Sequence, residues 1–410
     1  MSSPHLALPD FLFVREGQLH VDGVPVSQLA ARAGATPFYV YSRAAIGARI
    51  AALRAALPPA IHLHYAIKAN PMPALVAFMT TLVDGFDVAS AGELLTALNA
   101  GAAPETVSFA GPGKTAAELR QAVAAGVRVN IESRREIALL AELQQSLGLP
   151  ARVALRINPD FALKSAGMRM GGGARPFGID AEAAPDALAE IAATGLQFEG
   201  FHLFAGSQNL KSDAIIAAQQ ATLALIEQLA ECAPAPVRHC NLGGGFGIAY
   251  FPGETALDLA PIADNLAQLS ERAARTLPQA QLVLELGRYL VGEAGLYVCR
   301  VLDRKTSRGT VYLVCDGGLH QHLAASGNFG QVIRKNYPVR IATRMAADAP
   351  TEAVSIVGPL CTPLDILADN MTLPIAAPGD LVAVLQSGAY GASASPQAFL
   401  SHPPVRELLL

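Results

Sequence analysis

Two hydrophobic patterns alternate along the chain between about residues 60 and 290. Short runs of apolar and β-branched residues are followed by Ala- and Leu-rich segments with apolar residues at helical spacing. Strands that alternate with helices predict a parallel sheet, and eight such units over this length favour a β/α (TIM) barrel. An open, doubly wound sheet is the alternative fold. The eight predicted strands are IHLHYAIKAN, DGFDVAS, TVSFAG, VRVNIES, ARVALRINP, QFEGFHLFAG, VRHCNLGGG and AQLVLELGR.

The two ends of the chain carry strand patterns without such helices. FLFVREGQLHVDGVPV and TPFYVYS lie near the N-terminus, and EAVSIVG and GDLVAVL are among several strand-like runs near the C-terminus. These patterns predict a second, mostly-β domain built from both termini. We therefore expect the barrel to occupy residues 42–295, and the β domain to combine residues 1–41 and 296–410.

Composition narrows the class of protein. Of 410 residues, 51% are hydrophobic and 16% charged, which allows a large core and argues against disorder. The net charge of -4 gives no electrostatic basis for binding nucleic acid or an anionic membrane surface. No uninterrupted apolar stretch predicts a membrane span, and the N-terminus lacks the pattern of a secretory signal.

Cysteines and histidines indicate the compartment and argue against a metal site. The five cysteines are an odd number without CxxC spacing, which predicts reduced thiols in a cytoplasmic protein. The nine histidines form no cluster with the spacing of metal ligands. We expect no metal centre.

Lys68 lies at the end of the first predicted barrel strand. His62, His64, Ala66 and Lys68 share one face of that strand, because side chains alternate along it. On the inner face a lysine is desolvated, which lowers its pKa and frees a neutral amine for a Schiff base. The alternative is a solvent-exposed lysine in a βα loop.

Other strand ends carry residues that complement a reactive lysine. Residues 241–247 (NLGGGFG) provide consecutive backbone N–H groups that can hold a phosphate, although no P-loop Lys-Ser/Thr follows them. Glu285 and Arg288 lie at the end of the eighth predicted strand, and Phe204 and Ser207 lie at the end of the sixth. Taken separately, the glycine run could be a flexible turn, Phe204 a core side chain and Ser207 a helix N-cap. Together they meet at the barrel mouth where catalytic residues gather.

Pyridoxal phosphate is the cofactor that needs this combination. It requires a Schiff-base lysine, a phosphate cradle, a carboxylate at the pyridine nitrogen and a ring that stacks on its own. The carboxylate keeps the pyridine protonated, and therefore keeps the ring able to accept electrons.

At this point the sequence resembles a known family. The motifs YAIKAN, DVASAGEL, AGSQ, GGGFG, ELGR, GPLCTPLD and GAYG occur in the order found in the barrel-fold (alanine racemase-like, fold type III) pyridoxal phosphate decarboxylases. These include the diaminopimelate, ornithine and arginine decarboxylases. The resemblance extends from about residue 10 to the C-terminus. The stretches FAGSQNL and GNFGQVIRKNYP resemble the exosortase-associated subgroup.

The resemblance implies roles for individual residues. Lys68 would carry the cofactor, and Cys361 would come from the partner subunit as a proton donor, so that a homodimer shares its active sites. Asp87 and Glu93 would support the site from the second strand. The implied cofactor-binding residues are Lys68, Asp87, Phe204, Ser207, Gly243, Gly244, Gly245, Glu285, Arg288 and Tyr390. The implied substrate-binding residues are Arg288, Arg334, Tyr337, Thr362 and Asp365.

Two departures from the family pattern bear on the substrate. Phe204 stands where diaminopimelate decarboxylases usually have a histidine, and Thr362 stands where an acidic residue usually pairs with the distal amine of the substrate. The sequence therefore predicts an amino-acid α-decarboxylase whose substrate is neutral at its distal end or tethered to a carrier protein. A racemase on the same cofactor and a non-catalytic regulatory homologue are the alternatives.

Overall fold

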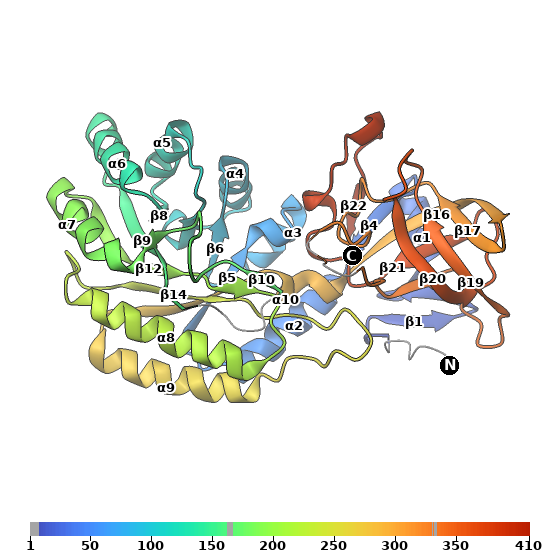
Figure 1. The fold of residues 1–410 in the computed structure, drawn as a ribbon, viewed down its shortest axis with the longest axis horizontal. Helices are drawn as coiled ribbons and strands as arrows, with labels where there is room; N and C mark the ends of the chain where they lie inside the picture. Colours follow the sequence, from blue (N-terminus) through green and yellow to red (C-terminus); the bar gives the residue numbers. More distant parts are fainter. Residues whose placement is uncertain (1–7, 162–166, 330, 332–333) are drawn as a thin grey trace. The chain divides into compact units, whose positions relative to one another are not determined.

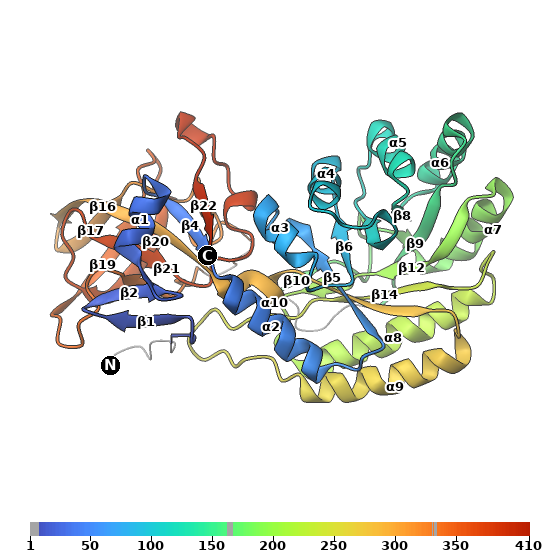
Figure 2. The same cartoon turned by 180° about the vertical axis from the view of Figure 1, so that it is seen from behind.

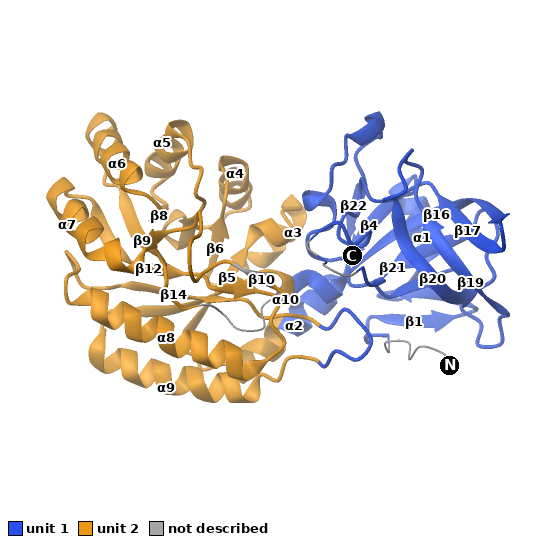
Figure 3. Ribbon diagram, viewed as in Figure 1, with its two compact units in different colours: residues 1–49, 249–255, 290–410 blue, residues 50–248, 256–289 orange. Residues whose placement is uncertain are grey.

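The chain forms two compact units in a computed structural model that describes residues 8–161, 167–329, 331 and 334–410. One unit combines residues 1–49, 249–255 and 290–410, and the other combines residues 50–248 and 256–289 (Figure 3). The first unit is therefore assembled from segments that are far apart in the sequence, whereas the second is interrupted only by residues 249–255.

A closed parallel barrel forms the larger unit (Figure 1). Its strands pair in sequence order, and the last pairs in parallel with the first to close the ring. This arrangement confirms the predicted β/α barrel and excludes the open sheet. The strands are β5 (Ile61–Ala66), β6 (Gly85–Val88), β7 (Val107–Phe109), β8 (Arg128–Ile131), β9 (Arg152–Asn158), β12 (Gln197–Leu203), β14 (His239–Gly244) and β15 (Gln281–Leu286).

Each gap between consecutive barrel strands contains a helix, as the Ala- and Leu-rich segments predicted. The longest, α8 and α9, pack side by side (Figure 2). Their apolar faces turn inward because apolar residues recur every three or four positions. The helices are α3 (Pro73–Met79), α4 (Ala91–Asn99), α5 (Ala116–Ala125), α6 (Arg134–Leu147), α7 (Ala184–Thr194), α8 (Ser212–Ala230) and α9 (Ala260–Thr276), and α2 (Arg43–Ala56) precedes the barrel.

Polar side chains fill much of the barrel interior. β/α barrels usually hold layers of Val, Ile and Leu there. Here the buried His64 of β5 contacts both Asp87 of β6 and the ring of His239 of β14. Asn130 of β8 donates to Ser108 of β7. The apolar core therefore lies mainly between the strands and the surrounding helices.

Strands from both ends of the chain build the smaller unit, which confirms the predicted mostly-β domain. β4 pairs antiparallel with β16 and parallel with the C-terminal β22, so both termini join one sheet. A short helix, α1 (Val26–Ala33), lies between β3 and β4 and was not predicted. The strands are β1 (Leu12–Arg15), β2 (Gln18–Val21), β3 (Val24–Pro25), β4 (Phe38–Tyr41), β16 (Gly295–Ser307), β17 (Thr310–Cys315), β18 (Val339–Ile341), β19 (Thr351–Val357), β20 (Ile366–Pro374), β21 (Leu381–Val384) and β22 (Arg406–Leu409).

Three general features concern the described part of the chain. All five cysteines are free thiols. Within the described ranges, no helix combines the length and apolar character that a membrane crossing requires. In the same ranges, no three His, Cys, Asp or Glu side chains come together as metal ligands would.

Candidate active site

Lys68 lies at the carboxyl end of β5, in a single 3₁₀ turn, η1 (Ile67–Ala69). The strand itself ends at Ala66, so Lys68 follows the strand rather than belonging to it. The Lys68 Nζ atom lies 3.4 Å from Oε1 of Glu285 and 5.1 Å from the centre of the Phe204 ring. The lysine side chain is 38% exposed, so the amine faces an acid and an aromatic ring while staying accessible.

Glu285 is the buried acid of this site. It lies on β15, and its second oxygen, Oε2, is 3.0 Å from Nε2 of His202 on β12. Both side chains are almost fully buried. Because an ionised carboxylate only accepts hydrogen bonds, His202 donates through Nε2. The histidine therefore fixes the orientation of the carboxylate, a role that the sequence did not reveal.

The surroundings keep Glu285 ionised. Burial alone would raise the pKa of this carboxyl group. The charge of Lys68, the hydrogen bond from His202 and the charge of Arg156 together hold the pKa below its ordinary value. A carboxylate that stays negative in a buried site can pair with a positively charged ring nitrogen.

The glycine run, Gly243–Gly245, spans the end of β14 and passes directly beside β12 and β15. Gly243 has a φ of 73°, and a Cβ added there would lie 2.7 Å from the carbonyl oxygen of Leu203. A Cβ at Gly244 would collide with the carbonyl oxygen of Glu285. Only glycine fits this path. The Gly243 N–H already donates to Oδ1 of Asn241 at 2.8 Å.

The loop after β12 is bound to the glycine run by backbone and side-chain hydrogen bonds. The Asn209 N–H donates to the Gly245 carbonyl, and the Gly247 N–H donates to the Asn209 carbonyl, both at 2.9 Å. Gln208 exchanges two further bonds with the backbone of Ile248, at 2.6 and 3.2 Å. Ser207, beside Gln208, therefore lies on the loop that borders the glycine run, as a shared phosphate site requires.

Two further predicted residues come from the second strand of the barrel. Asp87 lies inside the barrel, with Oδ2 3.2 Å from Nδ1 of His64. Glu93 accepts a hydrogen bond from the Ala89 N–H at 2.7 Å. Burial raises the pKa of Glu93, while that hydrogen bond and the charge of Lys68 oppose the rise. Glu93 is therefore within electrostatic reach of Lys68.

A buried ionic cluster follows β7, β8 and β9 and was not predicted. Arg156 Nη1 lies 2.7 Å from Oε1 of Glu132. The Lys114 ammonium lies 3.1 Å from Glu136 and donates to the carbonyls of Gly111 and Asn130. Lys114 and Glu132 follow β7 and β8, which was the available clue, whereas Arg156 lies within β9 and Glu136 in the first turn of α6. The Arg156 charge contributes to the low pKa of Glu285, so this cluster supports the site electrostatically.

The predicted catalytic cysteine lies in the smaller unit, in the loop between β19 and β20. Cys361 is exposed, and Thr362 next to it is half-buried. Asp365 is buried, and its two oxygens accept hydrogen bonds from the N–H groups of Leu319 and Leu360 at 2.6 and 2.8 Å. The Asp365 carboxylate therefore fixes the shape of the Cys361 loop.

Three other predicted residues also belong to the smaller unit. The Arg334 guanidinium donates to the Ser326 carbonyl, to Asn336 and to the Ile366 carbonyl at 2.8 to 3.2 Å. Tyr337 is buried against Tyr250, with ring centres 4.8 Å apart.

Tyr390 has a φ of 53° and packs against Phe329. Arg288, by contrast, opens α10 (Arg288–Val291), three positions after Glu285. Gly330, Val332 and Ile333 of the GNFGQVIRKNYP stretch lie outside the described residues.

Comparison with known proteins bears on both units. Residues 43–292 match the family described as "Pyridoxal-dependent decarboxylase, pyridoxal binding domain". The matched range includes the Lys68 site and every strand of the barrel.

Curated relatives and solved structures extend the match over nearly the whole chain. An L-glutamyl-[BtrI acyl-carrier protein] decarboxylase of Niallia circulans is 42% identical over 91% of this chain and 88% of its own. A diaminopimelate decarboxylase of Aquifex aeolicus is 34% identical over 93% of this chain and 88% of its own. The crystal structure of the M. jannaschii diaminopimelate decarboxylase in complex with L-lysine has a TM-score of 0.88 at 26% identity, covering 98% and 93% of the two chains.

Proposed function

The chain belongs to the family of pyridoxal-dependent decarboxylases, and we propose that its substrate is an amino acid joined through its side chain to a carrier protein. It is a pyridoxal phosphate-dependent amino-acid decarboxylase, a carboxy-lyase, as its relatives are. That function sets aside the racemase and the non-catalytic homologue. The observation that carries the substrate proposal is Thr362, the residue after Cys361. A substrate with a distal amine would need an acidic side chain at this position.

The residues around Lys68 fit the cofactor. Lys68 presents an accessible amine, Phe204 a flat ring, Glu285 a buried negative charge, and the glycine run a cradle that a Cβ would fill. When bound, pyridoxal phosphate supplies a conjugated ring that accepts the electron pair left as the α-carboxylate departs.

Each residue of the barrel mouth then has a defined task. Lys68 would hold the cofactor covalently until a substrate amine replaces it. Glu285 would keep a proton on the ring nitrogen, and His202 would hold Glu285 in place. Ser207, Gly244 and Gly245 would donate hydrogen bonds to the phosphate. Gly243, whose N–H donates to Oδ1 of Asn241, would shape the turn that holds them.

Cys361 is proposed as the proton donor. Loss of CO2 leaves an electron pair on Cα, and one proton must arrive there to complete the product. We assign this proton to the thiol of Cys361, delivered from the partner subunit of a homodimer. The thiol is exposed on a loop that Asp365 holds rigid, which suits a group that acts on another chain.

The Cys361 loop disfavours a substrate with a distal cation. A buried distal amine needs a carboxylate partner, and losing one costs about 3–5 kcal/mol. Thr362 supplies no charge, and both oxygens of Asp365 already accept backbone hydrogen bonds. The substrate-binding role of Asp365 stays a prediction.

A glutamyl group on a carrier protein meets these constraints. The α-carboxylate must be free to leave, so attachment through the side-chain carboxyl group is the only acyl linkage left for glutamate. That linkage also removes the distal charge. The relative that is 42% identical acts on such an acyl-carrier substrate, which supports the proposal.

The test compares CO2 release from three substrates: a glutamyl thioester on an acyl-carrier protein, free glutamate, and diaminopimelate. We expect the carrier-bound substrate to react roughly a hundredfold faster than diaminopimelate. Thr362→Glu should shift that ratio towards diaminopimelate, and Lys68→Ala should abolish all turnover. Efficient turnover of diaminopimelate by the unaltered protein, with none of the carrier-bound substrate, would refute the proposal.

A further inference from the structure

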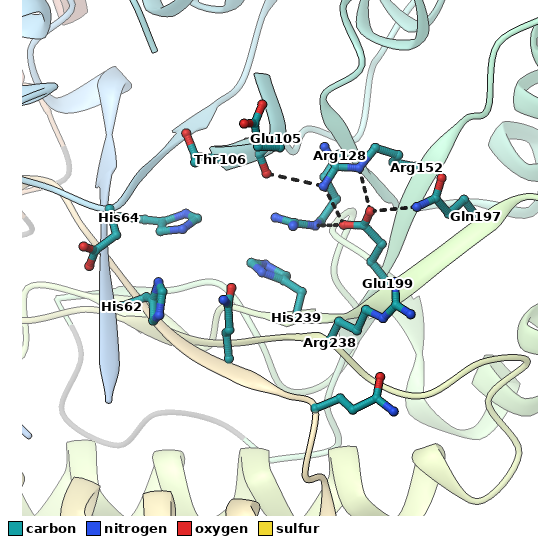
Figure 4. A pocket seen from close by; sticks show the side chains of 13 residues that line it. His62, His64, Glu105, Thr106, Arg128, Arg152, Gln197, Glu199, Arg238 and His239 are labelled. Atoms are coloured by element: carbon teal, nitrogen blue, oxygen red, sulfur yellow. Dashed lines mark hydrogen bonds and ion pairs between the residues drawn. The ribbon is translucent and has the colours of Figure 1, made fainter. Parts of the chain in front are cut away.

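A polar pocket opens at the opposite end of the barrel strands from Lys68 (Figure 4). We call it the basal pocket. Its volume is about 740 Å³, within the range of small-molecule sites. It is lined by residues at the start of the strands, whereas Lys68, Phe204 and Glu285 follow or end them. The lining residues that matter here are His64, Arg128, Arg152, Glu199, Arg238 and His239.

Two arginines share one carboxylate in the basal pocket. Arg128 Nε lies 2.7 Å from Oε2 of Glu199, while Arg152 contacts both Glu199 oxygens at 2.6 and 3.0 Å. Arg152 also donates to the carbonyls of Gly126 and Glu105. The three side chains are 9%, 18% and 7% exposed, in the order Arg128, Arg152, Glu199. The group therefore carries one net positive charge in a largely buried position.

A buried histidine with an unused nitrogen lies beside this group. His239 is 2% exposed, and its Nε2 has no hydrogen-bond partner among the described residues. Burial first, and then the positive charges of Arg128 and Arg152, lower the pKa of His239 well below its usual value. The ring is therefore neutral and can donate one hydrogen bond into a positive environment.

The nearby acids are already occupied or lie at the rim. Asp84 binds Arg54 and the Leu63 N–H, both at 2.7 Å. Asp87 faces His64 further inside the barrel. Glu105 is exposed, and its carbonyl rather than its carboxylate meets Arg152. The charge of Asp87 also acts on Arg128, but Glu199 is the one carboxylate among the described residues that Arg128 and Arg152 contact directly.

Arg238 adds an exposed cation at the rim of the pocket. The backbone N–H of Arg238 donates to the backbone carbonyl of Glu199 at 2.8 Å. This bond fixes the backbone from which the arginine side chain extends. Figure 4 shows the side chains of Arg128, His64 and His239 facing one shared space, with the Glu199 carboxylate directed at Arg128 and Arg152.

We propose that the basal pocket binds a small oxyanion, a carboxylate or a phosphate, held by Arg128 and His239 with Arg238 at the entrance. A purely structural plug of the barrel would need neither an excess cation nor open space beside it. Charge-assisted hydrogen bonds from a guanidinium suit both carboxylate and phosphate. This site is separate from the site that holds the cofactor.

The test is calorimetric titration of the cofactor-loaded enzyme at constant ionic strength. Inorganic phosphate and succinate are titrated separately, so that the two arms distinguish phosphate from carboxylate. We expect saturable binding of at least one anion, without any change in the cofactor absorbance. Arg128→Gln should weaken this binding about tenfold or more, the usual effect of losing a charge-assisted bond. Arg238→Ala should weaken it several-fold.

Arg120→Ala is the matched control, because Arg120 is an exposed arginine on α5 outside the pocket. The Arg120→Ala variant should bind phosphate and succinate with the same affinity as the unaltered enzyme. Arg238 is also exposed, so its variant keeps the test decisive if Arg128→Gln fails to fold. Absence of saturable binding for both anions, equal affinity in the Arg238 and Arg120 variants, or binding that alters the cofactor absorbance would each overturn the proposal.

Discussion

At the scale of single residues, the main addition of the structure is the contact between His202 and Glu285. The histidine bonds to Glu285, and we expect it to act through the carboxylate that it orients. Such supporting hydrogen bonds inside a buried site can change activity by one or two orders of magnitude. His202 is therefore a positioning residue.

We expect His202→Leu to lower kcat about tenfold and to leave KM nearly unchanged, because Glu285 would lose its donor. His202→Gln keeps an N–H donor and should restore much of the activity. Steady-state kinetics on all three proteins measure the effect. A KM increase with unchanged kcat would contradict the positioning role.

A second prediction concerns His322 in the smaller unit. Burial lowers the pKa of His322 to about 3. Its Nδ1 accepts from the Ala325 N–H, so Nε2 carries the proton and donates to Ser387 at 2.8 Å. Between pH 6.5 and the folded pKa, the unfolded chain binds a proton that the folded chain does not. The free energy of unfolding should therefore fall by about 1.4 kcal/mol per pH unit as the pH decreases.

Urea unfolding at pH 7, 6 and 5 measures this dependence. His322→Gln removes the titrating ring, so its slope of stability against pH should be shallower by that amount. Parallel slopes for the two proteins would show that His322 does not remain neutral in the folded state.

At the scale of elements, the ends of β12, β14 and β15 come together around the glycine run. The backbone bonds between Asn209 and the glycines join two loops that are more than thirty residues apart. The absence of a side chain at Gly244 lets this loop lie against the strand end that carries Glu285. Cofactor affinity should thus depend on backbone shape as much as on charged groups.

Gly244→Ala should reduce pyridoxal phosphate affinity at least tenfold, because the added Cβ collides with the Glu285 carbonyl. Gly47→Ala is the matched control, since a Cβ at Gly47 in α2 meets no atom within 4 Å. The control should bind the cofactor normally and gain about 0.5–1 kcal/mol of stability. Titration of the cofactor-free proteins, followed by visible absorbance, distinguishes these outcomes.

At the scale of the whole molecule, the proposed proton donor and the lysine belong to different units. Lys68 lies in the barrel, and Cys361 lies in a loop of the β-rich unit. The proposed homodimer pairs the lysine of one chain with the cysteine of the other. This arrangement can be tested without a structure of the dimer.

Lys68→Ala and Cys361→Ala should each be nearly inactive alone. Mixed after dissociation, the two variants should recover roughly a quarter of the normal activity, because half of the dimers are hybrids with one intact site. Recovery should require both variants in the same dimer. If mixing restores nothing although hybrids form, Cys361 acts within its own chain or not at all.

The sequence alone determined the barrel, the β-rich second unit and the identity of the principal groups at the strand ends. Hydrophobic periodicity is a local property, and Lys68, Phe204 and Glu285 follow or end strands whose carboxyl ends must meet in a closed barrel. The sequence could not predict which polar groups touch. His202 and Glu285 are 83 residues apart, and Arg128 and Glu199 are 71 apart. Only closure of the ring brings such residues together, because side-chain pairing across a barrel depends on strand register rather than on local pattern. The tertiary structure therefore decided the partners of Glu285, the loop-holding position of Asp365 and the basal pocket.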